Sequence, residues 1–291
     1  MKKHRMMTGI AAVLAAAFVF CGCGSAGLTG FYENSEKYAV GDASIKDKVE
    51  NIVIDWTSGE ITFTENNADT VDITEELSGT SKEEMRMRWF LDGTTLYVRY
   101  SAPKIRLISF GTIRKDLTVA LPKGLELEQL KIDATSAKIT AKDIKARDLA
   151  VDITSGSVDL GCVSENVEID AISGTVNAVC TADDIDIDAT SGKVYLTQKG
   201  SSKRIGIEVT SGRIEASAES FERMDLDGTS SDIELTLPED AGFTAEIDTT
   251  SGKFESDFAM KKKDDTYTAG DGSARIRIDV TSGDVYIKEA G

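Results

Sequence analysis

Ile169–Val176 reads Ile-Asp-Ala-Ile-Ser-Gly-Thr-Val, and the same frame returns at Ile187–Val194, which reads Ile-Asp-Ala-Thr-Ser-Gly-Lys-Val. Nine copies of this frame occur in the 291-residue chain, each with an aliphatic residue four places before a serine, an acidic residue three places before it and an apolar residue three places after it. The central serines are Ser58, Ser136, Ser155, Ser173, Ser191, Ser211, Ser230, Ser251 and Ser282. From Ser136 to Ser251 the copies recur about every 19 residues, and a short fixed period is typical of proteins that stack one repeat on the next.

Each copy predicts two strands joined by a corner. Apolar and polar residues alternate before and after the serine, as they do in a strand with one buried face. A glycine follows the serine in seven of the nine copies, and glycine adopts the positive φ that a sharp bend often needs. One coil of about 19 residues cannot bury its own apolar face. We therefore predict an all-β fold, a parallel β-solenoid whose coils stack in chain order around a shared core.

A stretch without the repeat separates the first two copies. Within residues 64–130 the sequence predicts a hairpin with strands over 85–91 and 94–100, joined by an Asp92-Gly93 turn. We expect this stretch to form a β-rich N-terminal cap that prevents strand pairing at the exposed end of the stack.

The remaining repeats occupy residues 131–288, and together with the cap they predict a single β-solenoid domain over 46–291. The last step, from Ser251 to Ser282, is clearly longer than the regular period. We expect its surplus, near Lys261–Asp265, to be an exposed loop.

The N-terminus has the features of a secretion signal. A basic start precedes an apolar stretch over residues 10–20, which is shorter than the roughly 20 residues of a membrane-spanning helix. Gly22 then precedes Cys23, a pairing that resembles the lipobox of bacterial lipoproteins. We expect residues 1–22 to be removed, Cys23 to carry the lipid and residues 23–45 to form a flexible tether. The alternative is an ordinary cleaved signal peptide.

The charge excludes nucleic acid as a partner. The formal net charge is −17, and loss of the leader lowers it by three to −20, so the chain repels phosphate backbones and anionic lipid. Attachment to a membrane would therefore depend on the lipid at Cys23. We expect that lipid to hold the protein on the outer face of the bacterial cytoplasmic membrane, or on the outer membrane of a Gram-negative cell.

Besides the leader cysteines, the chain has Cys162 and Cys180, each seven places after its repeat serine. Equivalent positions on neighbouring coils are about 4.8 Å apart, which is within the Cα range that a disulfide tolerates. Parallel side-chain directions are poor disulfide geometry, so we expect free buried thiols, with a disulfide as the alternative.

The acidic residue of each frame would form a column of carboxylates along the stack. One hypothesis is a Ca²⁺ ion held between coils by Asp152, Asp170 and Asp188, since Ca²⁺ prefers oxygen ligands. The alternative, which we favour, is a solvated stripe whose carboxylates accept hydrogen bonds at their own corners.

The sequence argues against catalysis. His4 is the only histidine and lies in the leader, so a Ser-His-Asp triad is impossible in the mature chain. The serines recur in every copy and are explained as structural, although Ser191 and Lys193 are close enough to leave a Ser-Lys pair open. A polysaccharide-active β-helix enzyme is the minor alternative, but such enzymes need one distinct coil with long loops, and these coils are short and alike. We expect no cofactor.

Aromatic and basic residues gather in the cap region. We expect Trp89 to belong to the core of the cap, and Arg106, Ile108 and Phe110 to form a candidate partner surface, with cap core plus flanking charge as the alternative.

The Thr-Ser-Gly corners, the turn Leu121–Gly124 and the ending Gly270–Ile287 together resemble the DUF4097 "putative adhesin" family of bacterial envelope proteins, over roughly residues 48–287. The resemblance implies a stacked β-solenoid and brings no catalytic residues. We expect a non-catalytic envelope lipoprotein that acts as an adhesin-like interaction or scaffolding module, with an envelope protein or a cell-wall or host glycan as partner. Since some relatives are associated with envelope-stress regulation, the alternative is an accessory or sensor protein of such a system.

Overall fold

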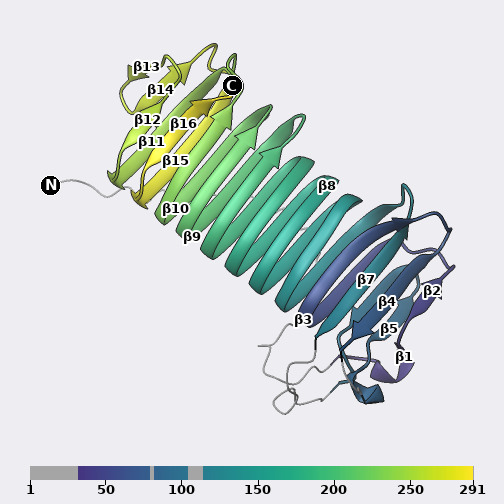
Figure 1. Ribbon diagram of the computed structural model, residues 1–291. Helices are drawn as coiled ribbons and strands as arrows, with labels where there is room; N and C mark the ends of the chain where they lie inside the picture. The colour runs from purple at the N-terminus through teal and green to yellow at the C-terminus, as the bar shows by residue number, and fades with distance from the viewer. Residues whose placement is uncertain (1–31, 79–81, 104–113, 291) are drawn as a thin grey trace.

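The computed structural model describes residues 32–78, 82–103 and 114–290. Nearly all of this part is β-strand, and the strands lie side by side as rungs of one long ladder (Figure 1). The strands are β1 (Ala39–Val40), β2 (Ala43–Ile45), β3 (Asn51–Asn66), β4 (Val71–Leu77), β5 (Arg88–Asp92), β6 (Thr95–Arg99), β7 (Lys115–Pro122), β8 (Glu126–Gln198), β9 (Ser202–Ala218), β10 (Phe221–Leu237), β11 (Phe243–Ser251), β12 (Phe254–Ser256), β13 (Lys261–Lys263), β14 (Thr266–Ala269), β15 (Ala274–Ser282) and β16 (Val285–Glu289). The helices of these ranges are two 3₁₀ turns, η1 (Ser35–Lys37) and η2 (Glu83–Met85), and neither is long and apolar enough to span a bilayer.

Each coil contributes one strand before its corner and one after it, so the stack has two walls. Corner serines of neighbouring coils lie in register along parallel strands: Ser58 is opposite Ser136, and Ser191 is opposite Ser211. β8 runs through four coils without a break because the ladder of hydrogen bonds continues around the corners. The predicted all-β parallel solenoid is confirmed.

The first wall has the strand order β1-β5-β6-β3-β8-β9-β10-β15-β11-β14-β13. The second wall contains the strands after the corners, in the order β2-β4-β7-β3-β8-β9-β10-β16-β12. Strands β3, β8, β9 and β10 belong to both walls because they bend at their corners.

The core is a narrow stack of aliphatic side chains between the two walls. The residues four places before the corner serines and three places after them are at most 2% exposed in every copy except one. The exception is the Ser251 copy, whose Ile247 and Phe254 are only partly buried because this coil lies at the end of the stack. Burying one such side chain contributes about 1.5–3 kcal/mol, so the repeated columns contribute substantially to the favourable free energy of folding.

The corner glycines allow neighbouring coils to approach closely. Gly174 has a φ of 143°, and a Cβ built on it would overlap the carbonyl oxygen of Gly156 in the next coil. The same relation holds between Gly192 and Gly174. The predicted positive φ is therefore confirmed, and an L side chain is excluded at these positions both by φ and by lack of space.

The N-terminal cap contains a further coil that lacks the corner motif. β6 pairs in parallel with the first half of β3, and β7 pairs in parallel with the second half. The expected hairpin is formed by β5 and β6, but its turn is Gly93-Thr94, one position later than predicted, because Asp92 still pairs with Thr95. Part of the stretch 64–130 thus belongs to the stack itself.

The expected tether over residues 23–45 is wrong in its second half. β1 pairs with β5 and β2 pairs with β4, so residues 39–45 are part of the cap. Tyr38 also packs on Phe90, with ring centroids 5.5 Å apart. Such short strands cannot show an alternating pattern, and for this reason the sequence did not reveal them.

The last two copies are out of chain order. β15 lies between β10 and β11, so Ser282 is opposite Ser230 on one side and Ser251 on the other. The expected stacking in chain order is therefore wrong here. The expected loop near Lys261–Asp265 is instead the hairpin β13–β14, and β14 pairs with β11 at the end of the stack. The long step from Ser251 to Ser282 gives the chain enough residues to form the hairpin β13–β14 beside β11 and then to place β15 between β10 and β11.

In the described part of the chain, the outermost strands of the two walls are the very short β1, β2, β12 and β13. Such short edges offer few free N–H and C=O groups to another molecule. β13 also consists of three exposed lysines, Lys261–Lys263, and charged edges oppose pairing further. Both ends of the stack are thus protected against edge-to-edge association.

The corner geometry predicts that Gly174→Ala destabilises the central coils, and Gly174→Val does so more strongly. A residue with Cβ must abandon the positive φ or displace the neighbouring carbonyl, at a cost of about 1–3 kcal/mol. Thermal unfolding followed by circular dichroism measures this. Gly161→Ala is the matched control, because a Cβ there would meet nothing closer than 3.5 Å. Equal melting temperatures for the two alanine variants would contradict the corner description.

Candidate functional site

The acidic residues of the frame form one row along the outer face of the first wall. Their neighbours in sequence point into the core, so strand alternation turns the carboxylates outward. In adjacent coils Asp55 lies opposite Asp133, and Asp188 opposite Glu208. This acidic row consists, in stacking order, of Asp55, Asp133, Asp152, Asp170, Asp188, Glu208, Asp227, Asp279 and Asp248.

The middle of the acidic row lines a surface groove of about 400 Å³. One side of the groove is the five carboxylates from Asp133 to Glu208, and the other side is the residues directly before the corner serines, Thr154, Ile172, Thr190 and Thr210. The groove crosses five coils, so it is roughly 20 Å long at the ladder spacing of about 4.8 Å. Ile172 is 56% exposed and gives the groove one apolar contact.

The carboxyl group at the centre of the groove, Asp170, has a strongly raised pKa. Partial burial, followed by the charges of Asp152, Glu168 and Asp188, raises the pKa of Asp170 to about 6. Burial likewise raises the pKa of Asp133 and of Asp188. Each of these carboxyl groups is easier to protonate than a free one, because its anion is partly desolvated and lies beside other anions.

Few cations compensate this row. Lys131 lies 3.4 Å from Asp152, Arg99 lies 3.7 Å from Asp55 at the cap end, and Arg277 lies 3.3 Å from Asp279 near the other end. All three acidic side chains are substantially exposed, and such ion pairs contribute little to stability. The groove therefore attracts cations, and its threonine hydroxyls add hydrogen-bond donors and acceptors.

The three residues of the calcium hypothesis, Asp152, Asp170 and Asp188, do line one groove. They lie on successive coils in a line, and across the described ranges no three acidic, histidine or cysteine side chains converge on a point that could hold a metal ion. Calcium binding by these three residues stays a prediction for a titration followed by melting temperature.

Other predicted residues are placed as follows. Cys162 and Cys180 are buried on neighbouring coils, and their sulfur atoms are not bonded to each other in this structure. Trp89 is partly buried against the core of the cap. Arg106, Ile108, Phe110 and the lipid-attachment residue Cys23 lie outside the described residues.

A comparison with family models identifies the family of this chain. The model described as Toastrack DUF4097 matches residues 49–288. The chain belongs to this family. The match spans the repeats and the cap, and it confirms the resemblance seen in the corners.

Solved structures with similarity to this DUF4097 chain include a putative adhesin from Parabacteroides merdae, with 11% identity, coverage of 88% of this chain and 97% of that one, and a TM-score of 0.42. A putative adhesin from Bacteroides fragilis has 12% identity, coverage of 88% and 98%, and a TM-score of 0.35. A putative cell adhesion protein from Clostridium sporogenes has 10% identity, coverage of 87% and 100%, and a TM-score of 0.24. A comparison with curated proteins found no match.

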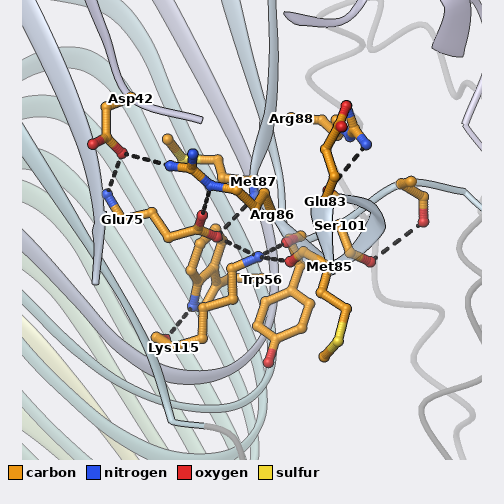
Figure 2. A network of polar contacts seen from close by, with 12 residues as sticks. Asp42, Trp56, Glu75, Glu83, Met85, Arg86, Met87, Arg88, Ser101 and Lys115 are labelled. Carbon is orange, nitrogen blue, oxygen red and sulfur yellow. Dashed lines mark hydrogen bonds and ion pairs between the residues drawn. The ribbon is translucent and has the colours of Figure 1, made fainter. Parts of the chain in front are cut away.

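A second polar site of this DUF4097 chain escaped the sequence analysis. Lys115 takes the place of the corner glycine in the cap coil, beside Gly59, and its side chain is 1% exposed. Figure 2 shows its ammonium group between the Glu75 carboxylate and backbone carbonyl groups. The ammonium donates to the carbonyl oxygens of Met85, at 2.7 Å, and of Tyr100. The available signal was a lysine at the corner position directly before the alternating residues of β7.

The other groups of this network are satisfied as well. Glu75 accepts a hydrogen bond from the backbone N–H of Met87 at 2.7 Å, and Arg86 lies 3.4 Å from its carboxylate (Figure 2). Trp56 donates its indole N–H to the carbonyl oxygen of Lys115 at 3.3 Å. Burial lowers the pKa of Lys115 to about 8, against the opposing influence of Glu75. All three ammonium protons have acceptors. We therefore interpret Lys115 as a structural residue that holds the segments of the cap together, and not as a nucleophile.

The raised pKa of Asp170 predicts a pH-dependent stability. Between roughly pH 4 and pH 6 the native state binds this proton more tightly than the unfolded chain, so the contribution of Asp170 to stability falls as the pH rises through 6. We expect Asp170→Asn to raise the melting temperature at pH 7.5 and to reduce the difference between pH 5 and pH 7.5. Asp240→Asn, in an exposed turn, is the control. A variant that melts like the wild type at both pH values would contradict the repulsion.

The Lys115 network predicts a large cost for removing one partner. Lys115→Met removes the buried cation beside the carboxylate of Glu75, which keeps only Arg86 at 3.4 Å, and leaves the carbonyl groups of Met85 and Tyr100 without their donor; we expect a cost of about 3–5 kcal/mol. The double variant Lys115→Met/Glu75→Gln should recover part of this loss, because the buried carboxylate charge is gone. Urea unfolding of the four proteins gives the coupling free energy. Additive losses in the double variant would show that the two groups do not stabilise each other.

Proposed function

We propose that this DUF4097 chain is a non-catalytic interaction module of the cell envelope, adhesin-like in that it presents a repeated surface to a partner. The observation that carries the proposal is the groove of the acidic row. It is built from the acidic position of five successive coils and from the position before the serine in four of them, so it offers equivalent contacts at regular spacing. A surface of this kind suits an elongated partner that carries positive charge, because each coil adds a similar small attraction.

The geometry favours binding over catalysis. An enzyme site needs a few groups that differ from their surroundings in position and pKa. Here the carboxylates that line the groove repeat from coil to coil, and the serines beside them are exposed at every corner from Ser155 to Ser211. Regular repetition distributes the interaction along the stack and singles out no pair of residues for acid–base chemistry.

The proposal includes attachment through Cys23. Tyr32 and Tyr38 pack together in the cap, with ring centroids 4.7 Å apart, so the folded part begins shortly after Cys23. The intervening segment, from Cys23 to Tyr32, reaches at most about 30 Å when fully extended. A lipid on Cys23 would therefore keep the cap near the membrane and leave the far end of the stack pointing away from it.

Chemical cross-linking on whole cells tests the proposed function. The groove variant Asp152→Asn/Asp170→Asn/Asp188→Asn should lose at least tenfold in the yield of partner conjugates, because it removes three of the five carboxylates. Raising the salt concentration should weaken the wild type in the same direction.

The matched control removes the same charge elsewhere. Glu239→Gln/Asp240→Asn/Asp265→Asn changes three exposed residues in turns outside the groove. It should retain the wild-type yield. An equal loss in both variants would show that net charge alone matters, and release of soluble products from glycans or peptidoglycan fragments by the purified protein would overturn the non-catalytic assignment.

A further inference from the structure

Two thiols face each other inside the stack. Cys162 and Cys180 occupy the same position of adjacent coils, and their Sγ atoms are 3.3 Å apart. The residues are only 6% and 1% exposed. This pair is separate from the acidic row, which lies on the outer face of the first wall, and the proposed function does not use it.

Although the two side chains leave adjacent coils in parallel, the Cα spacing of the coils and the short distance between the sulfur atoms permit a covalent bond. Equivalent residues of adjacent coils are about 4.8 Å apart, and disulfides accept Cα separations of about 4.4–6.8 Å. Closing the sulfur atoms to a bond of about 2.05 Å requires a movement of only about an ångström, shared between two short side chains. On the inner face Cys180 is flanked by Ala178 and Ala182, whose small side chains leave room for this rotation.

Burial decides when the bond can form. Because the thiols are hydrogen-bonded to each other and desolvated, the pKa of Cys162 is raised and the reactive thiolate is scarce in the folded state. An oxidant in solution also has no direct access to side chains this deeply buried. Oxidation is therefore favoured while the coils are still assembling.

We propose that Cys162 and Cys180 become joined by a disulfide when the chain folds in the presence of a disulfide oxidant. The two thiols lose two protons and two electrons, one S–S bond forms between the coils, and the S–S bond of the oxidant breaks to give two thiols. The cross-link closes a loop of one coil and restricts the unfolded chain, so it stabilises the native stack. It also fixes the register of the two coils that carry Asp152 and Asp170, where carboxylate repulsion acts against stacking.

Peptide mapping tests the bond directly. The full chain is refolded with a mixture of reduced and oxidised glutathione, alkylated under denaturing conditions and digested with trypsin. Residues 148–193 form one tryptic peptide that contains both thiols and no other cysteine. We expect this peptide to be unalkylated and lighter by two hydrogen atoms, and to accept two alkyl groups after reduction. Two alkyl groups without prior reduction, or a cross-link to a second chain, would overturn the proposal.

Thermal unfolding tests the stabilising role. The oxidised wild type should melt several degrees higher than the same protein in dithiothreitol. The variant Cys162→Ser/Cys180→Ser should be insensitive to dithiothreitol, because it has no thiols in the stack to oxidise. An oxidised protein that melts no higher than the reduced one would contradict the stabilising role of the disulfide. Partner cross-linking by the serine variant reports on the proposed function independently, so failure of one proposal leaves the other measurable.

Discussion

The close approach of neighbouring coils at their corners is the constraint on which the rest of the structure depends. The space where a side chain would begin on Gly174 is filled by the carbonyl oxygen of Gly156, and the relation repeats from coil to coil. With no Cβ in the way, the backbones reach hydrogen-bonding distance on both sides of the bend. Both walls then share one register, and every aliphatic column points inward, since a shift of one position would turn the columns outward.

The register that builds the core also brings like charges together. The outward acidic residue of each frame repeats at the ladder spacing, so the charges of Asp152 and Asp188 add to the effect of partial burial in raising the pKa of Asp170. The burial of aliphatic side chains on the other side of the same strands offsets this repulsion. Structural regularity and surface chemistry in this DUF4097 chain thus have one origin, the repetition of a single frame. The proposed function uses the surface that this repetition creates.

The local features of the fold could be predicted from the sequence, and the long-range ones could not. Alternation and the corner glycines predicted the strands, the bend and the inward residues because each depends on neighbours within a few positions. The place of Ser282 between Ser230 and Ser251 was missed, since all copies carry the same columns and any order satisfies them. The buried Lys115 finds its partners on other segments of the cap, beyond the reach of a periodic pattern. For the candidate site, the acidic column was evident, whereas its concave shape depends on how the corners bend.

The exchanged order of β11 and β15 has a consequence for synthesis on the ribosome. β11 emerges first, and it carries the same columns as β15, so a nascent chain that has reached Ser256 offers β11 to the edge of β10. In the finished protein that edge belongs to β15. Any early pairing of β11 with β10 must therefore break before β15 can take its place. Alternatively, β11 stays unpaired until β15 is synthesised, and the two strands then pack on β10 together. The strand β15, which follows Ser256 in the chain, has to lie between β10 and β11. This end of the molecule therefore cannot be completed in the order in which it is translated.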